Sequence, residues 1–233
     1  MDFFQNHYFY FFLLFITIIF PLLASFESRI RYFQKWKKLF TGIFLMMLIF
    51  IPWDIYFSYN NIWHFSDDFT IGLDVFKLPI EEWLFFICIP FSCVFIYESL
   101  DYFSPLKKPF PYIEKIALFL SVLLLIFAWI FYDQLYTNVC FSLSSFALIV
   151  LSFKNEKWIS SFFRWFLVCM IPFLLINGFL TGSFSDPIVT YNADHIIGFR
   201  IPFFNIPIED CFYNLIMLLT TLFFYDKINR IVY

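Results

Sequence analysis

The sequence predicts an all-α membrane protein with seven transmembrane helices, and three observations support this class. Of the 233 residues, 62% are hydrophobic and only 14% are charged, whereas soluble domains carry about 25% charged residues. Long uncharged runs recur along the chain, and too little sequence lies between them for a separate globular domain of about 50 residues. The seven runs are 3–26, 39–53, 83–97, 116–132, 134–153, 165–185 and 211–225.

Basic residues fall on one side of these predicted helices. Only Lys77 and Arg200, of the 15 Lys and Arg residues, follow an even-numbered run. Cytoplasmic loops carry the excess of positive charge, so we predict an external N-terminus and a cytoplasmic C-terminus. The first run is too long for the core of a signal peptide, which predicts a helix of the mature protein. We expect an integral protein of a bacterial cytoplasmic membrane.

One phrase of sequence occurs twice, 128 residues apart, at the start of the third and seventh runs. Leu78-Pro79-Ile80-Glu81-Glu82 corresponds to Ile206-Pro207-Ile208-Glu209-Asp210, and an Ile-Gly pair precedes each copy. We predict two parallel three-helix repeats, residues 1–105 and 134–233, joined by a spacer transmembrane helix in 106–133. Parallel repeats place a binding site at their interface, so both acid pairs are expected to face one cavity from the outer side.

The two acid pairs are the candidate catalytic groups. Proline and acids in a first helical turn are also ordinary helix chemistry. However, the uncharged runs after Glu82 and Asp210 have 15 residues each, about 22 Å against about 30 Å of hydrocarbon. Carboxylates drawn toward membrane depth usually mark functional sites, and adjacent ones share a proton, so that one stays neutral. Glu81 and Glu209 are the first choices for the working acid, and Glu82 and Asp210 for the tuning or proton-accepting partners.

Further polar and aromatic residues near the ends of the runs are candidate substrate contacts. Helix capping explains Asn177 about as well as substrate binding does, whereas Asp54 opposes its helix dipole and needs a partner or a proton. Arg200 is a candidate counter-ion for the acids, although Trp63, Arg200 and the other loop residues are expected by default at a solvated surface. Aromatic side chains beside the acids are able to stabilise a cation; they are Trp83, Phe85, Phe86, Phe212 and Tyr213.

Together these motifs resemble the membrane lycopene cyclases of the archaeal, fungal and actinobacterial heterodimeric type, with both halves fused in one chain. The resemblance covers essentially all residues, although Cys211, Tyr213 and Asn214 replace Trp83, Phe85 and Phe86 of the first copy. It implies conversion of the linear ends of lycopene to β-rings without net redox change and without flavin. The implied partners are lycopene or a related linear carotenoid, the lipid bilayer and other enzymes of carotenoid synthesis. No cofactor, metal or nucleic acid is expected.

The residue types suit this chemistry independently of the resemblance. Protonation of a terminal alkene creates a tertiary cation, the next double bond closes a six-membered ring, and loss of a proton ends the reaction. A neutral carboxylic acid in a dry site supplies the proton, while an ionised neighbour stabilises the cation or recovers a proton.

Three other classes of membrane protein have some of these features. A retinal-binding photoreceptor needs a Schiff-base lysine in its last helix, and 211–225 contains none. A prenyltransferase is disfavoured because Asp67-Asp68 lacks a third acid at the required spacing. A proton-coupled transporter, or another non-enzymatic protein that binds carotenoid or lipid, stays open because buried carboxylates and parallel repeats suit it equally.

Overall fold

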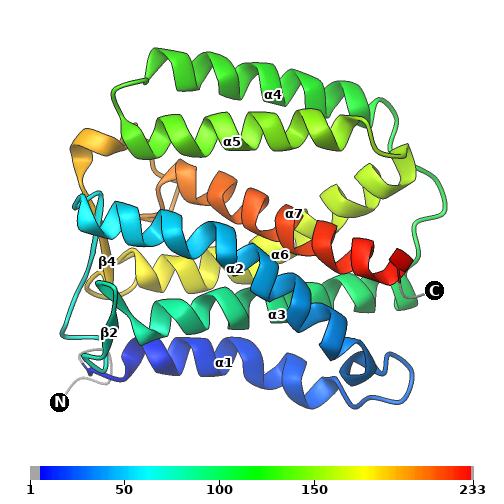
Figure 1. Ribbon diagram of the computed structural model, residues 1–233, viewed down its shortest axis with the longest axis horizontal. Helices are drawn as coiled ribbons and strands as arrows, with labels where there is room; N and C mark the ends of the chain where they lie inside the picture. Colours follow the sequence, from blue (N-terminus) through cyan, green and yellow to red (C-terminus); the bar gives the residue numbers. More distant parts are fainter. Residues whose placement is uncertain (1–5, 232–233) are drawn as a thin grey trace.

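Seven α-helices occur in residues 6–231, the part of the chain that the computed structural model describes (Figure 1). The first predicted run begins at residue 3, so residues 3–5 of it lie outside this part. The helices are α1 (Phe9–Ala24), α2 (Trp36–Tyr59), α3 (Ile80–Phe103), α4 (Ile113–Ile130), α5 (Leu135–Ser152), α6 (Glu156–Leu180) and α7 (Ile208–Ile231). Short 3-10 turns are η1 (Tyr32–Lys35) and η2 (Ala193–His195).

Six of these helices, α2 to α7, are long and apolar enough to cross a membrane. The predicted all-α class is confirmed, and the six apolar helices are compatible with a membrane protein. Helix α1 has 16 residues, about 24 Å, so its role as a seventh span stays a prediction.

Helices α3 and α7 run well beyond the uncharged segments that predicted them, to 24 residues each. The extension of α3 is possible because Glu98, buried near its end, has two partners. Lys35 forms an ion pair with the Glu98 carboxylate, and the Tyr225 hydroxyl donates to it. A buried charge with such partners no longer has to end a membrane helix.

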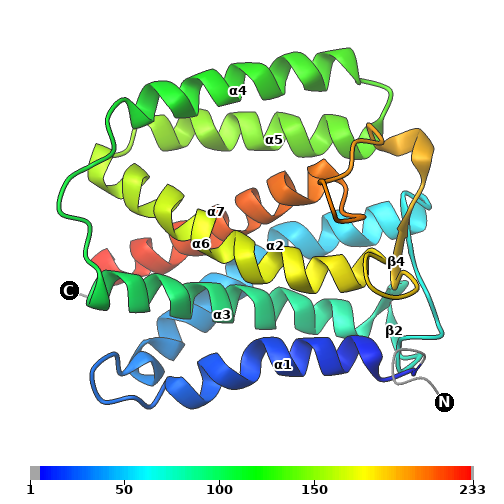
Figure 2. The same ribbon diagram turned by 180° about the vertical axis from the view of Figure 1, so that it is seen from behind.

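The helices form a layered bundle in which α4 and α5 pack together at one edge (Figure 1). Helices α2 and α7 cross on the face seen in Figure 1, and α1, α3 and α6 occupy the opposite face (Figure 2). Helices α1 to α3 form the first half of the protein, and helices α5 to α7 form the second half. In each half the first helix packs against the third, as α1 against α3 and as α5 against α7.

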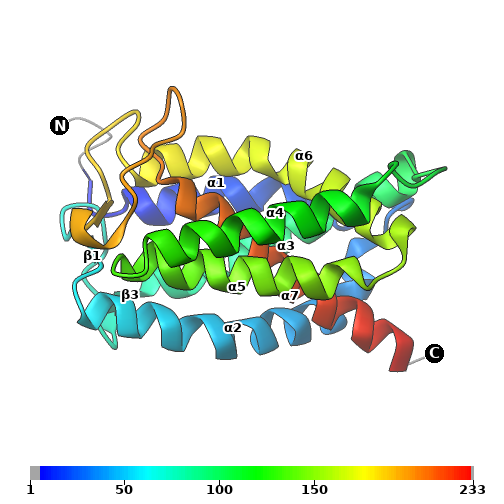
Figure 3. The same cartoon turned by 90° about the horizontal axis from the view of Figure 1, so that it is seen from above.

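Two short strand pairs lie at the end of the bundle away from the C-terminus (Figure 3). Strand β1 (Trp63–Phe65) pairs antiparallel with β4 (Val189–Tyr191), and β2 (Asp74–Val75) pairs with β3 (Leu78–Pro79). In the first pair Trp63 is opposite Tyr191, and Phe65 is opposite Val189. The pair therefore joins the loop between α2 and α3 to the loop between α6 and α7. The sequence did not predict it, because its strands are very short and far apart in the chain.

Candidate active site

A small buried pocket lies beside the β1–β4 pair, where helices of both halves meet. Its volume is about 60 Å³. Three carboxyl groups reach it, those of Asp54, Glu82 and Asp210, whose side chains belong to residues only 2%, 8% and 6% exposed. The other lining residues are Tyr10, Trp63, Phe65, Phe85, Tyr136, Phe173, Asn177, Leu180, Val189, Tyr191 and Tyr213. The pocket thus contains residues from both halves and from the strand pair above them.

Glu82 and Asp210 enter the pocket from the first turns of α3 and α7. Pro79 is extended, with φ −60° and ψ 148°, and starts α3 just before its acids. The Tyr10 hydroxyl donates to Glu82 Oε2 at 2.6 Å, and the Tyr136 hydroxyl donates to Asp210 Oδ1 at 2.8 Å. These tyrosines belong to α1 and α5, so each half contributes a matching Tyr–acid pair.

Asp210 is the most heavily hydrogen-bonded of the three carboxyls. In addition to Tyr136, Asn177 Nδ2 and the Tyr191 hydroxyl each donate to its Oδ2 at 2.8 Å. Three donors stabilise an ionised carboxylate. Tyr191 lies on β4, outside the helices, and burial together with the Asp210 charge raises the pKa of its hydroxyl well above the usual 10. The tyrosine therefore keeps its proton and remains a donor.

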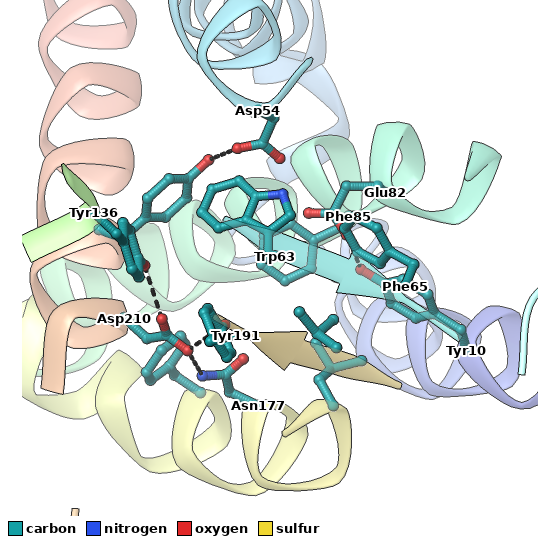
Figure 4. Close-up of a pocket in the computed structure, with 14 residues that line it drawn as sticks. Tyr10, Asp54, Trp63, Phe65, Glu82, Phe85, Tyr136, Asn177, Tyr191 and Asp210 are labelled. Atoms are coloured by element: carbon teal, nitrogen blue, oxygen red, sulfur yellow. Dashed lines mark hydrogen bonds between the residues drawn. The ribbon is translucent and has the colours of Figure 1, made fainter. Parts of the chain in front are cut away.

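Asp54 reaches the pocket from α2 and accepts one hydrogen bond, from the Tyr213 hydroxyl at 2.7 Å. Trp63 lies in the middle of the site, with Glu82 and Tyr10 on one side and Asp210 and Tyr136 on the other (Figure 4). Its ring centroid is 5.3 Å from that of Tyr136 and 6.3 Å from that of Tyr213. The pocket therefore combines acids with aromatic rings, which are the two groups that carbocation chemistry needs.

Glu81 and Glu209 are buried but do not line this pocket. Glu81 Oε1 accepts the Ile71 backbone N–H at 2.8 Å, and Glu209 Oε1 accepts that of Ile197 at 2.8 Å. The Thr137 hydroxyl also donates to Glu209 Oε1, at 2.5 Å. In both glutamates Oε2 is buried and has no hydrogen-bond partner among the described residues. Each glutamate thus ties the loop that precedes its helix to the start of that helix in the same way.

The remaining predicted residues divide between the pocket and its surroundings. Phe85 and Tyr213 line the pocket together with Asp54 and Asn177, whereas Trp83, Phe86 and Phe212 do not. Phe86 packs against Phe50 with ring centroids 6.3 Å apart, and Phe212 packs against Phe141 at 5.1 Å. Trp83 Nε1 lies 3.4 Å from the Val75 carbonyl.

Arg200 lies outside the pocket and donates to the Asn205 carbonyl at 3.1 Å. Its guanidinium carbon is 5.9 Å from the centre of the Tyr191 ring. Within residues 6–231 it forms no ion pair with either acid motif. Its predicted contact with the acids is therefore not among the interactions of this structure.

Several residues of the pocket were not predicted. Trp63 was expected at a solvated surface, and that expectation was wrong because β1 folds inward and leaves this residue 6% exposed. Tyr10 and Tyr136 could have been recognised only weakly from the sequence, by their similar spacings of 72 and 74 residues before the acids that they contact. Nothing in the sequence indicated Tyr191, because its position depends on pairing between distant strands.

Comparison with known proteins places the chain in a family. A family model described as lycopene cyclase matches residues 7–100 and 133–228. A bifunctional lycopene cyclase/phytoene synthase of Aspergillus oryzae is 31% identical over 65 residues, which are 28% of this chain and 11% of that protein. One of Leptosphaeria maculans with the same description is 37% identical over 51 residues, 22% of this chain and 9% of that protein. The alignments thus span about a tenth of these curated relatives. No solved structure matches.

These relatives are fungal, so the expected bacterial cytoplasmic membrane gains no support. The two matched segments contain both acid motifs and all three pocket carboxyls. Because the family model covers more than half of the sequence, the chain belongs to the lycopene cyclase family.

Proposed function

We propose that this protein converts the linear ends of lycopene to β-rings by acid catalysis in the pocket beside the β1–β4 pair. The observation that carries the proposal is the meeting of Asp54, Glu82 and Asp210, all buried, in one pocket lined mainly by aromatic and apolar side chains. The family supplies the substrate class. A hydrocarbon substrate offers no group for a carboxylate to bind, so three buried carboxyls in its site have proton transfer as their natural task.

The proton comes from a carboxyl group that is neutral before the reaction. Glu82 and Asp54 each accept a single tyrosine hydrogen bond, which stabilises a charge less than the three donors on Asp210 do. We assign the acid role to Glu82, with Asp54 as the second protonated group. Transfer of the Glu82 proton to the terminal alkene breaks its O–H bond, forms a C–H bond and leaves a tertiary cation in the pocket.

Ring closure and proton loss complete the reaction without any redox change. The next double bond attacks the cation and forms the new C–C bond, which moves the positive charge onto a ring carbon. The Asp210 carboxylate stabilises this charge and takes up the ring proton, and proton exchange with Glu82 then restores the starting state. The faces of Trp63, Tyr136 and Tyr213 are each able to lower the cation energy by about 0.5 to 2 kcal/mol.

Glu81 and Glu209 act one step away from the substrate in this scheme. Their bonds to Ile71 and Ile197 hold the outer loops, and the same glutamates start the helices that carry Glu82 and Asp210. The sequence favours Glu81 and Glu209 as the working acids, whereas this scheme gives that role to the pocket acids of each pair. Mutation of both members of each pair decides between the two assignments.

The membrane arrangement belongs to the same proposal. Helix α1 is the seventh span, the N-terminus and the strand pairs lie on the external side, and the C-terminus is cytoplasmic. The two repeats, 1–105 and 134–233, are then related about an axis along the membrane normal that passes through the pocket. The matching Tyr10–Glu82 and Tyr136–Asp210 bonds support this symmetry.

Expression in a lycopene-accumulating bacterial host tests the proposed activity. We expect extracted pigments to contain carotenes with β-rings, identified by chromatography and mass spectrometry. Unchanged lycopene, in cells whose membranes contain the folded protein, would refute the activity. A Glu82→Gln variant at the same abundance is the matched control and should leave the lycopene linear.

A further inference from the structure

The pocket is too small for the reacting end of a carotenoid as it stands. Its volume is about 60 Å³, whereas an apolar protein cavity known to bind benzene has a volume of about 150 Å³. The end group that becomes a ring is larger than benzene, and the rest of the molecule is a long polyene. Substrate binding therefore requires that the pocket open into neighbouring space that also accommodates the tail.

Two apolar grooves flank the pocket on opposite faces of the bundle. One, of about 320 Å³, lies among α1, α3 and α6 (Figure 2), and the other, of about 280 Å³, lies among α2, α5 and α7 (Figure 1). The two grooves are equivalent when the halves are matched, because α1, α3 and α6 correspond to α5, α7 and α2. For example, Ser92 on α3 lines the first groove, and Thr220, at the matching position of α7, lines the second.

The two grooves differ in how they meet the pocket. Phe173 lines both the pocket and the α1/α3/α6 groove, so its side chain forms part of the wall of each space. None of the described residues that line the α2/α5/α7 groove also lines the pocket. On that side Trp53 packs against Tyr213 with ring centroids 4.9 Å apart, and the Tyr213 hydroxyl is bonded to Asp54.

Sequence differences between the halves explain this asymmetry. The residue before Asp54 is Trp53, whereas the residue before its counterpart Asn177 is Ile176, which lines the α1/α3/α6 groove. The bulky Trp53 lies between its groove and Tyr213 of the pocket, whereas the smaller Ile176 lines the other groove. The α2/α5/α7 groove also contains Lys154, whereas every residue that lines the α1/α3/α6 groove is uncharged.

The α1/α3/α6 groove opens sideways on the outer surface of the bundle. Phe20 and Leu175 on its rim are 69% and 51% exposed. In the proposed orientation this rim faces lipid, so that a hydrocarbon is able to enter from the bilayer without crossing water. Among the described residues, the polar side chains of its lining are those of Thr17, Ser92 and Cys93, and the Ser92 hydroxyl already donates to the Thr17 carbonyl at 3.0 Å.

We propose that the α1/α3/α6 groove is the binding site for the polyene tail of the carotenoid, and that Phe173 is the gate through which the reacting end reaches the acids. The proposal rests on the proposed function for the identity of the ligand. It assigns one active site and one entry groove to the whole molecule. A substrate whose two ends both react must therefore leave and re-enter with its other end first.

The test blocks each groove at the matching position. Purified protein in detergent is given lycopene, and two quantities are measured: the lycopene retained by the protein, from its visible absorbance, and the initial rate of ring formation. Ser92→Phe should lower both lycopene retention and kcat/KM at least tenfold. The matched control Thr220→Phe should stay within about twofold of the wild-type protein in both, and membrane abundance and melting temperature report folding.

A second variant guards against loss of folding at Ser92. Ile176→Trp introduces the indole that closes the other groove, at a half-buried position, and should also lower retention at least tenfold. The assignment is overturned if Thr220→Phe lowers retention and rate as much as Ser92→Phe does, or more. It is also overturned if Ser92→Phe and Ile176→Trp both retain as much lycopene as the wild-type protein.

Wild-type protein that retains lycopene without forming rings would refute the proposed activity alone. In that case the amounts of lycopene retained by the variants still test the groove.

Discussion

Replacement of Asp210 by Asn tests the assignment of the pocket carboxylate most directly. Asn is nearly isosteric with Asp but is uncharged, and one of its two terminal atoms is an N–H donor. Tyr136, Tyr191 and Asn177 all point donors at Asp210, so in either orientation the amide NH₂ group faces at least one of them, and a tyrosine hydroxyl there has to turn and accept a hydrogen bond instead of donating one. The variant thus loses the charge and the set of three donors that stabilises it.

The expected loss follows from these two effects. Removal of one preorganised group that stabilises charge in a transition state costs about 2.7 to 4 kcal/mol, or roughly 10²- to 10³-fold in kcat. We therefore expect Asp210→Asn to lower the rate of ring formation at least 100-fold. The rearranged hydrogen bonds cost about 1 kcal/mol of folding free energy, which should appear as a slightly lower melting temperature.

The preceding residue provides the matched control. Glu209 Oε1 accepts the hydrogen bonds from Thr137 and Ile197, and its Oε2 has no partner. Glu209→Gln therefore keeps the acceptor and places the NH₂ group where no bond is lost. We expect less than a tenfold loss of activity. The new NH₂ group is buried without an acceptor within residues 6–231, so the melting temperature should fall, and activities are therefore compared for the folded protein only.

The assay measures initial rates of ring formation from lycopene with purified protein, by chromatographic separation of linear, monocyclic and bicyclic products. Both variants are compared at equal folded concentration. A folded Glu209→Gln protein that is less active than Asp210→Asn would refute the reasoning. That result would return the acid role to Glu81 and Glu209, the order that the sequence favours.

Three further outcomes are expected. Tyr10→Phe removes the donor to Glu82 Oε2 and should cost about 1 kcal/mol, or roughly fivefold in rate; an unchanged rate would separate this bond from catalysis. In deuterated water, with lycopene as the only addition, mass spectrometry should find about one deuterium per ring, and a strict requirement for added flavin would contradict the acid mechanism. In a cysteine-free background, a cysteine at the exposed position of Asp68 should react with an impermeant thiol reagent from outside, and one at Lys107 should not; the reverse pattern would invert the topology.

The sequence was sufficient to predict the helices. Uncharged runs long enough to cross a bilayer are a local property of the chain, and the structure contains helices α2 to α7 at these runs. The ends of the helices were less predictable. Helix α3 continues past Glu98 because Lys35 and Tyr225, both distant in sequence, provide partners for that carboxylate. A hydropathy pattern does not contain such partners.

The candidate site was located by its repeated motif, but the roles within it depend on three-dimensional packing. Successive residues of an α-helix point about 100° apart, so Glu81 and Glu82 cannot both face the same pocket. Which one faces inward depends on the rotation of α3 against α1, where Tyr10 meets Glu82. The same holds for Glu209 and Asp210 on α7.

The amino-acid sequence was sufficient to predict an all-α membrane protein, to reveal the doubled Pro-Ile-acid-acid motif and to single out Asp54 and Asn177 as polar residues at the ends of apolar runs. These features are local in the chain, and local chemistry is sufficient to recognise them. The packing of helices and strands places Trp63, Tyr191, Glu82 and Asp210 in the lining of the pocket and puts Phe173 between the pocket and one groove. Those facts arise from contacts between residues far apart in sequence, which form only when the two halves pack together.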